Sequence, residues 1–260
     1  MDRKTVLITG GAQGSGRSFA LYFADRGFDI ILADRQATDS PAYREVIGQL
    51  EAKGGAVLAR QCDVASTQAV EGLFHAAWEQ FKRLDVVIAN AGLVTLGETW
   101  NLTDAQVNAT LAVNLAGTWR TNKYAARCML RQGSGKIINI ASIAALVGVY
   151  YHAAYCMSKW GIIGLTKTLA KELQGRNISV NAVCPTPVKT PLSETKEFIA
   201  YMNRVMGTRF ANAEEMYADP RTRFLEPETV ARMCYWLATS EEAATLTGQE
   251  IPMDLYGLTL

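Results

Sequence analysis

The N-terminal segment reads Thr5-Val6-Leu7-Ile8-Thr9-Gly10-Gly11-Ala12-Gln13-Gly14-Ser15-Gly16, an apolar run followed at once by a glycine-rich turn. The apolar run predicts a short buried strand, and a helix is expected to begin near Arg17. Glycine permits the tight backbone turns between them, and the unpaired N–H groups of a helix start favour a pyrophosphate. The segment therefore predicts a dinucleotide-binding turn, with a plain structural turn as the alternative. Its expected contact residues are Gly10, Gln13, Gly14, Ser15 and Gly16.

The same alternation of strand and helix continues along the chain. Helical spacing of apolar residues separates the strands, as at Phe19, Tyr22 and Phe23. Such alternation predicts an α/β domain with parallel strands, helices on both faces, and ligands beyond the carboxyl ends of the strands. The further predicted strands are Asp29–Ala33, Ala56–Arg60, Val86–Ala89, Lys136–Ile140 and Ser179–Val183.

Composition narrows the class of partner. The chain has 260 residues, which one α/β domain spanning 1–260 can accommodate, with 26 basic and 25 acidic side chains. This near balance gives no long-range field for nucleic acid or an anionic membrane, so a small molecule is the expected partner.

The cysteines and the N-terminus indicate the compartment. Five cysteines without CxxC spacing are expected to be reduced thiols. The Val6–Ile8 run is too short for a signal sequence or a membrane span, so we expect a cytoplasmic protein. With only two histidines, we expect no metal site.

Polar residues follow the second, third and fourth predicted strands. Asp34 stands about 20 residues after the glycine turn, where a carboxylate accepts hydrogen bonds from adenosine ribose and favours NAD over NADP. Arg35 beside it could instead meet the 2′-phosphate of NADP. Further cofactor contacts are expected at Asp63 and Val64 and at Asn90, Ala91 and Gly92, although a capping or turn role is an alternative for Asp63 and Asn90.

A second group of residues suggests chemistry. Tyr155 and Lys159 lie one turn apart on a helix that begins near His152, so the phenol and the ammonium share one face. Ser142 follows the fifth predicted strand. Asn114 lies in a mostly apolar helix, where a buried amide needs hydrogen-bonding partners. Taken singly, each has a structural alternative: a solvated helix pair, a turn serine or a kink-filling amide.

Together these residues resemble the classical short-chain dehydrogenase/reductases over essentially the whole chain. The matching elements are Thr9-Gly10 with Gly14-Ser15-Gly16, Asp63, Asn90-Ala91-Gly92, Asn114, Ser142, Tyr155 and Lys159. The resemblance implies a single Rossmann-type, doubly wound domain with a seven-stranded parallel sheet, and a homotetramer or homodimer. It implies a catalytic tetrad of Asn114, Ser142, Tyr155 and Lys159, in which Ser142 orients substrate, Lys159 also binds nicotinamide ribose and Asn114 holds a water relay.

Electrostatics are compatible with Tyr155 as general acid/base. A free phenol has a pKa of about 10, and lowering it to about 7 requires roughly 4 kcal/mol of stabilisation of its anion. A Lys159 ammonium about 4–5 Å away contributes roughly 3–4 kcal/mol at an effective dielectric near 20. We therefore expect a phenol poised by its lysine.

The chain departs from the family pattern after the sixth strand. The family commonly has Pro-Gly here, whereas this chain reads Pro185-Thr186-Pro187-Val188-Lys189-Thr190. Thr186 cannot adopt a positive φ as freely as glycine. Pro185, Val188 and Thr190 are still expected to contact nicotinamide. This variant resembles the carveol dehydrogenases, which act on alicyclic secondary alcohols, although the insertion that many of them carry after the second strand is missing.

A long excursion follows, and we interpret 191–224 as a substrate lid. Its apolar residues, among them Met202, Met206 and Phe210, face either a hydrophobic substrate or one another in a helical hairpin or subunit contact. His152 is either a substrate contact or a helix-start residue.

The sequence thus predicts an NAD-dependent oxidoreductase that acts on an apolar or alicyclic secondary alcohol or its ketone. The alternatives are an NADP-linked reductase of ketoacyl or steroid type and a non-catalytic dinucleotide sensor.

Overall fold

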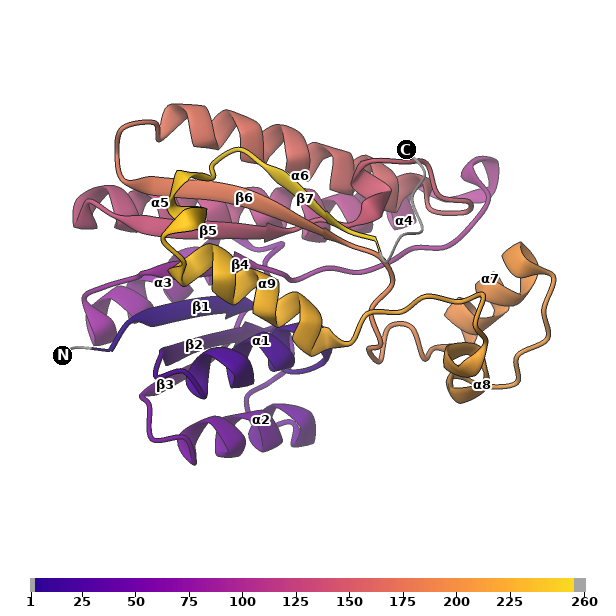
Figure 1. Ribbon diagram of the computed structural model, residues 1–260, viewed down its shortest axis with the longest axis horizontal. Helices are drawn as coiled ribbons and strands as arrows, with labels where there is room; N and C mark the ends of the chain where they lie inside the picture. Colours follow the sequence, from indigo (N-terminus) through magenta and orange to yellow (C-terminus); the bar gives the residue numbers. More distant parts are fainter. Residues whose placement is uncertain (1–2, 255–260) are drawn as a thin grey trace.

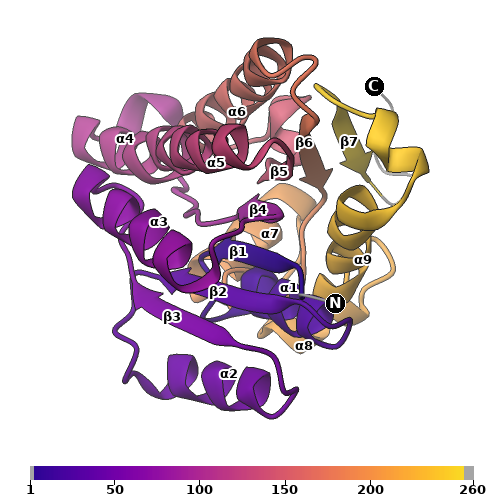
Figure 2. The same cartoon turned by 90° about the vertical axis from the view of Figure 1, so that its left-hand side faces the viewer.

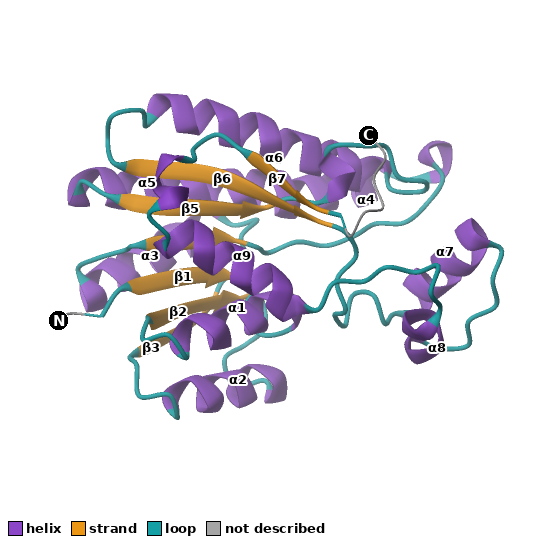
Figure 3. Ribbon diagram, viewed as in Figure 1, coloured by secondary structure: helices purple, strands orange, loops and turns teal. Residues whose placement is uncertain are grey.

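Strands and helices alternate along the chain, and the computed structural model describes residues 3–254 (Figure 3). The strands are β1 (Thr5–Thr9), β2 (Asp29–Asp34), β3 (Val57–Gln61), β4 (Val86–Ala89), β5 (Gly135–Ile140), β6 (Ile178–Pro185) and β7 (Glu250–Met253). All pair in parallel, in the order β3-β2-β1-β4-β5-β6-β7. The predicted α/β fold with a seven-stranded parallel sheet is confirmed.

Helices cover both faces of this sheet. They are α1 (Gly14–Ala24), α2 (Pro41–Glu51), α3 (Thr67–Phe81), α4 (Asp104–Thr110), α5 (Thr118–Gln132), α6 (Ala153–Glu172), α7 (Lys196–Met206), α8 (Ala213–Ala218) and α9 (Pro227–Thr239). Figure 2 shows α1, α2 and α9 on one side of the sheet and α3, α5 and α6 on the other. A π-helical turn, Leu111–Gly117, joins α4 to α5, and shorter 3₁₀ turns are Thr99–Asn101, Ile143–Ala145 and Glu242–Thr245.

Each face of the sheet has its own hydrophobic core. Successive strand residues point to opposite faces, so Ile8 packs with α1 and α9 while Leu7 packs with α3 and α5. Burial on both faces explains why the central strands read as continuous apolar runs rather than as alternating ones. It is also the reason that their positions could be predicted.

Some boundaries differ from the predicted ones. The first helix begins at Gly14, not near Arg17, because the Arg17 N–H already bonds to the Gln13 carbonyl at 3.2 Å. The third strand begins at Val57 rather than Ala56. The residue pattern did not reveal β7, which is four residues long and contains Pro252, a residue tolerated at a sheet edge.

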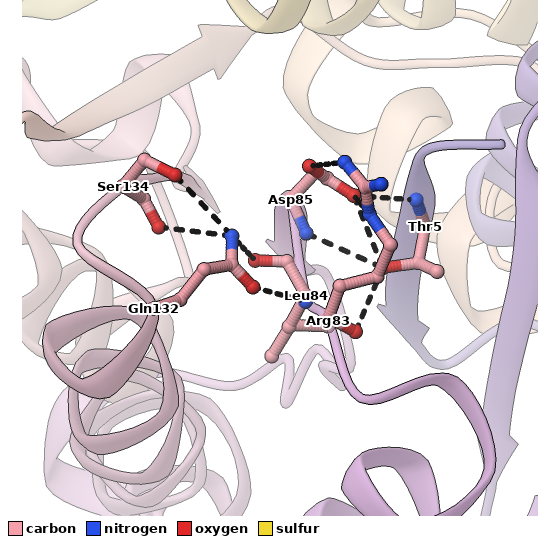
Figure 4. Close-up of polar contacts among 6 residues, drawn as sticks. All are labelled: Thr5, Arg83, Leu84, Asp85, Gln132 and Ser134. Carbon is pink, nitrogen blue, oxygen red and sulfur yellow. Dashed lines mark hydrogen bonds and ion pairs between the residues drawn. The ribbon is translucent and has the colours of Figure 1, made fainter. Parts of the chain in front are cut away.

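A polar network fastens the amino ends of β1, β4 and β5 (Figure 4). The Asp85 carboxylate accepts hydrogen bonds from the Thr5 backbone N–H at 2.8 Å and from both Arg83 Nε and a terminal guanidinium nitrogen. The Gln132 amide oxygen accepts from the Leu84 N–H at 2.8 Å. These hydrogen bonds therefore hold the amino ends of the strands in register. Ligands are expected at the opposite edge, where the strands have their carboxyl ends. There the strand order reverses between β1 and β4, the usual binding crevice of such sheets.

Helices α7 and α8 project from that carboxyl edge, away from the body of the sheet (Figure 1). The two ends of the excursion are joined at its base, since the Lys189 N–H donates to the Leu225 carbonyl and the Leu225 N–H to the Pro187 carbonyl, both at 2.9 Å. Phe198, Ile199 and Met216 are buried in a small core of the excursion itself. The excursion is thus a hairpin with a fixed base. Within residues 3–254, no helix combines the length and apolarity needed to cross a membrane.

Candidate active site

The glycine turn after β1 has no room for side chains. Gly10 and Gly14 have φ values of +69° and +55°. A Cβ on Gly16 would lie 2.0 Å from the Gly10 carbonyl oxygen. Helix α1 begins at this turn without a side-chain cap, at the exposed Gln13, and has no acidic residue in its first turn. The turn therefore fits a pyrophosphate, which such a helix start attracts.

Asp34 fastens this turn to the end of β2. Its carboxylate accepts hydrogen bonds from the backbone N–H groups of Ala12 and Gln36, each at 3.0 Å, and the residue is 7% exposed. A carboxylate can accept about four hydrogen bonds, so capacity remains for ribose hydroxyls. Arg35 is exposed beside it.

Asn90 supports the turn from the end of β4. Its side-chain amide donates to the carbonyls of Thr9 and Gly10 at 3.0 and 3.1 Å. A Cβ on Gly10 would lie 2.9 Å from Ala91 Cα, so the Asn90-Ala91 backbone closes over the turn. Asn90 thereby supports the glycine turn through its side chain, and its contact with a cofactor stays a prediction.

The other predicted cofactor residues also lie along this edge. Asp63 is exposed and accepts from the Ala65 N–H at 2.8 Å, as a turn-forming aspartate does. Val64 is buried against Gly117, where a Cβ would come within 2.6 Å of its side chain. Gly92 lies beside the Asn114 amide: a Cβ added to Gly92 would be 3.3 Å from Asn114 Oδ1.

The structure brings Ser142, Tyr155 and Lys159 together at the carboxyl end of β5. Ser142 follows β5 and forms a hydrogen bond with the Tyr155 hydroxyl. Lys159 is 4% exposed, its Nζ donates to the Ile140 carbonyl at 2.8 Å, and it lies 5.3 Å from the centre of the Tyr155 ring. Lys159 is thus buried and Tyr155 partly buried, so the two side chains are not a solvated helix pair.

The expected poising of Tyr155 by its lysine is wrong for the protein alone. Burial raises the pKa of Tyr155 to about 12 and outweighs the hydrogen bond with Ser142, which lowers it. Burial likewise lowers the pKa of Lys159 to about 8. The cost of removing each charge from water outweighs the attraction between the two charges.

Asn114 lies in the π-helical turn and is completely buried. Its amide exchanges two hydrogen bonds with the Leu93 backbone, both at 2.9 Å, and donates to Ser158 Oγ at 3.1 Å. Asn114 therefore joins the segment after β4 to α6, next to Tyr155 and Lys159. This anchoring agrees with the structural alternative, and the water relay stays a prediction.

The Pro185–Thr190 variant is accommodated without a positive φ at Thr186. Pro185 ends β6, and the Thr186 N–H bonds to the Met253 carbonyl at 2.9 Å. Thr190 lies against the glycine turn, 3.3 Å from the position of a Gly14 Cβ. Val188 forms an isolated parallel β-bridge with Leu225. Pro185 and Thr190 therefore lie at the carboxyl edge of the sheet, beside the glycine turn.

The contacts that join the 191–224 excursion to the body of the protein were not predicted. Arg204 of α7 forms an ion pair with Glu98 at 2.7 Å and stacks on Tyr151, 4.3 Å from the ring centre. The His152 ring lies edge-to-face against Tyr201 of α7, 4.8 Å between centres. Such contacts between distant segments leave no periodic signal in a sequence.

Comparisons with known proteins agree with this geometry. The family model described as short chain dehydrogenase matches residues 4–198. A 3-oxoacyl-[acyl-carrier-protein] reductase of Synechocystis is 35% identical over 257 residues, covering 98% of this chain and 96% of the relative. D-threitol dehydrogenase of Mycolicibacterium smegmatis is 34% identical over 254 residues, covering 98% and 92%.

Solved structures share this fold at somewhat lower sequence identity. An actinorhodin polyketide ketoreductase variant with NADPH has a TM-score of 0.87 at 31% identity, covering 97% of this chain and 96% of that one. The carveol dehydrogenase from Mycobacterium avium in complex with NAD has a TM-score of 0.88 at 25% identity, covering 96% and 95%. With the matched family model, the relatives and the shared fold in agreement, this chain belongs to the short-chain dehydrogenase family, whose members are oxidoreductases that use NAD or NADP.

Proposed function

We propose that this chain transfers a hydride between NAD and a secondary alcohol or its ketone, with Tyr155 as general acid/base. The observation that carries the proposal is the cluster of Ser142, Tyr155 and Lys159 at the same sheet edge as the glycine turn. Nicotinamide, when bound, supplies the hydride acceptor or donor. The proposed cofactor residues are those predicted from the sequence, from Gly10 to Thr190.

Each catalytic side chain has a task that follows from its contacts. In oxidation the Tyr155 phenolate takes the alcohol proton and becomes the phenol; in reduction the phenol gives that proton to the carbonyl oxygen. Ser142, already bonded to that hydroxyl, orients the substrate oxygen. Lys159 provides the positive charge that favours the phenolate, and a further cation at the cofactor site strengthens the effect. Asn114 holds the α6 helix in place through Ser158.

We propose NAD as the preferred cofactor because Asp34 ends β2 with a fixed carboxylate. A ribose hydroxyl can donate to it, whereas the 2′-phosphate of NADP would be repelled. Among similar proteins, the carveol dehydrogenase is described with NAD and the polyketide ketoreductase with NADPH, so the family admits both.

The proposed substrate is a small alicyclic or largely apolar alcohol that enters beneath the 191–224 lid. Tyr201 packs on His152, which in turn packs on Tyr155, so aromatic rings lie next to the proposed acid/base and support a ring-shaped substrate. The apolar residues of the lid pack chiefly on one another, so their own contribution to the substrate surface is small.

A second candidate is an NADP-linked keto reductase. The exposed Arg35 beside Asp34 and the similarity to a 3-oxoacyl reductase favour it. A homodimer or homotetramer is proposed for either activity, since Trp119, Met157 and Trp160 expose large apolar side chains on α5 and α6.

The test is nicotinamide absorbance during incubation with alicyclic, aromatic, polyol and steroid alcohols, with NAD and NADP in parallel. We expect NADH formation with alicyclic alcohols. Turnover with NADP only would replace the proposal by the keto reductase. Cofactor binding without any turnover would indicate a dinucleotide sensor.

A further inference from the structure

His152 lies between the proposed general acid/base and the lid. It directly precedes α6 and is 6% exposed. Its ring packs edge-to-face on Tyr155, with centres 5.8 Å apart, and on Tyr201 at 4.8 Å. Any substrate that reaches the Tyr155 hydroxyl therefore passes close to this imidazole.

The protonation state of His152 follows from its single hydrogen bond. Its Nδ1 lies 2.7 Å from the Tyr150 carbonyl oxygen, which can only accept, so Nδ1 carries the proton. Burial lowers the pKa of His152 and keeps the ring neutral near pH 7. A neutral imidazole protonated on Nδ1 presents a lone pair on Nε2. His152 is thus fixed as an acceptor on its outer nitrogen.

That acceptor is open. Nε2 bonds to no residue within 3–254, whereas every enclosed side-chain nitrogen and oxygen in that part of the chain has a partner. Nε2 therefore keeps access to solvent instead of being sealed among the aromatic rings. An acceptor held rigidly beside a catalytic phenol is available to a donor on the substrate.

The spacing suits a second oxygen on the same small molecule. The His152 and Tyr155 rings are in edge-to-face contact, with centres 5.8 Å apart, so a small molecule bonded to the phenol oxygen lies beside the imidazole. The Tyr155 and Ser142 hydroxyls receive the reacting oxygen. A hydroxyl on the neighbouring carbon then lies within reach of the imidazole.

We propose that His152 determines specificity by accepting a hydrogen bond from a hydroxyl adjacent to the reacting carbinol, so that the preferred substrates are vicinal diols and the corresponding α-hydroxy ketones. This inference rests on the proposed function. In oxidation, the carbinol carbon loses its hydride to the nicotinamide and its hydroxyl proton to Tyr155. The neighbouring hydroxyl donates to His152 throughout and is chemically unchanged.

The experiment compares kcat/KM for cis-1,2-cyclohexanediol and cyclohexanol with NAD. We expect the diol to be preferred by roughly 10- to 100-fold, because a site built for a hydroxyl discriminates against a substrate that lacks it. His152→Phe retains an aromatic ring between Tyr155 and Tyr201 but removes the acceptor, so the diol-to-alcohol ratio should fall towards one. His152→Gln restores an acceptor and should recover part of the ratio.

The matched control is His75→Phe, which changes the other histidine, exposed on α3, and should leave the ratio unaltered. A binding readout accompanies the kinetics: the Kd of the diol for the protein–NADH complex, followed by NADH fluorescence, should rise about 10-fold in His152→Phe. Circular dichroism of each variant reports folding. If His152→Phe is unfolded, His152→Leu, which also removes the acceptor, provides the same comparison.

The outcomes separate the two proposals. NADH formation from both substrates with a ratio near one, or a ratio and Kd unchanged by the His152 variants, overturns the role of His152 and leaves the proposed function standing. Absence of turnover with every alcohol and diol overturns the proposed function and this inference together.

Discussion

Tyr155 and Lys159, the proposed acid/base and its lysine, show how strongly burial shifts the pKa values of neighbouring side chains. Both side chains lie at the end of β5, and burial raises the pKa of the phenol to about 12 while lowering that of the amine to about 8. Burial thus shifts the pKa of each group in the direction of its uncharged form, and the Lys159 amine still keeps its proton below about pH 8. A cation bound nearby would favour the phenolate. Activation of Tyr155 thus depends on what binds next to it.

Tyr155→Phe should fold and bind NADH but lose turnover by at least roughly 10²-fold, because the ring packing stays and the transferable proton is gone. Turnover is measured by NADH absorbance and binding by NADH fluorescence. Tyr235→Phe is the control, since Tyr235 packs its ring on Phe23 and Phe28, away from the site. Wild-type turnover in Tyr155→Phe would remove Tyr155 from the mechanism.

Asp34→Ser should weaken NAD binding and improve NADP binding. The substitution removes a carboxylate that attracts ribose hydroxyls and repels a phosphate by roughly 2–4 kcal/mol, or about 30- to 1,000-fold in affinity. It also removes the acceptor for the Ala12 N–H, so a modest fall in Tm is expected. Titrations with NADH and NADPH measure the change, with Asp39→Ser on the exposed side of the same loop as control. Equal affinity of the unmodified protein for both cofactors would contradict the assignment to NAD.

The β1–α1 connection acts as one rigid element. Asn90 and Asp34 each bond to its backbone, and its glycines leave no space between the turn and its neighbours. A close-packed turn of this kind presents backbone N–H groups without side-chain interference.

Gly16→Ala should therefore weaken NADH binding by at least roughly 10-fold, because a Cβ 2.0 Å from the Gly10 carbonyl oxygen forces the turn apart. Gly48→Ala is the matched control, since nothing lies within 4 Å of that Cβ on the exposed side of α2. The control should gain about 0.5–1 kcal/mol of stability. Undisturbed NADH affinity in Gly16→Ala would show that the turn does not hold the cofactor.

The 191–224 excursion is an element with its own core and a fixed base. Its contacts with the body of the protein include the Arg204–Glu98 ion pair and the Tyr201–His152 ring pair. It can therefore influence the substrate end of the site, and it meets the glycine turn at its first residue, Pro191, 3.7 Å from the position of a Gly14 Cβ.

Replacing residues 191–224 by a short linker, with the Val188–Leu225 bridge retained, should raise KM for bulky alcohols far more than the Kd of NADH. The reason is that the turn and Asp34 hold the adenosine end independently of the excursion. Steady-state kinetics and NADH fluorescence provide the two values. Comparable losses in both, or a change of oligomeric state on size exclusion, would assign the excursion a structural role.

Considered as a whole, the molecule carries a stability cost at its active site. The buried Lys159 amine has a pKa of about 8 instead of 10.5, so between these values the unfolded chain binds more protons at this residue than the folded one. Its contribution to the free energy of unfolding therefore rises with pH across that window. Below about pH 8 the folded protein bears the full cost of a protonated buried amine.

Lys159→Met should remove this dependence and stabilise the protein near pH 7 relative to wild type by roughly 2–3 kcal/mol at most, with the difference shrinking towards pH 10. Urea unfolding at several pH values measures it. Lys171→Met, an exposed position on the same helix, is the control. If the difference in free energy of unfolding between Lys159→Met and wild type did not change with pH, burial would not lower the pKa of Lys159.

The architecture could be predicted from the sequence because it arises from local, repeated signals. Strands buried on both faces read as apolar runs, and the glycine turn after β1 is recognisable by backbone requirements that only glycine meets. The tetrad positions followed from resemblance, and the structure brings Ser142, Tyr155 and Lys159 to one place. The edge strand β7 escaped prediction because four residues that include a proline carry no pattern.

Only the tertiary structure decided the electrostatic state of the site and what surrounds it. The pKa values of Tyr155 and Lys159 depend on how much water the packed chain excludes, which residue identity and spacing do not encode. The position of His152 between Tyr155 and Tyr201 likewise joins segments 49 residues apart in sequence, 152 to 201. Local chemistry specified the strands, the turn and the reactive side chains, whereas solvent exclusion and long-range packing set their protonation and their neighbours.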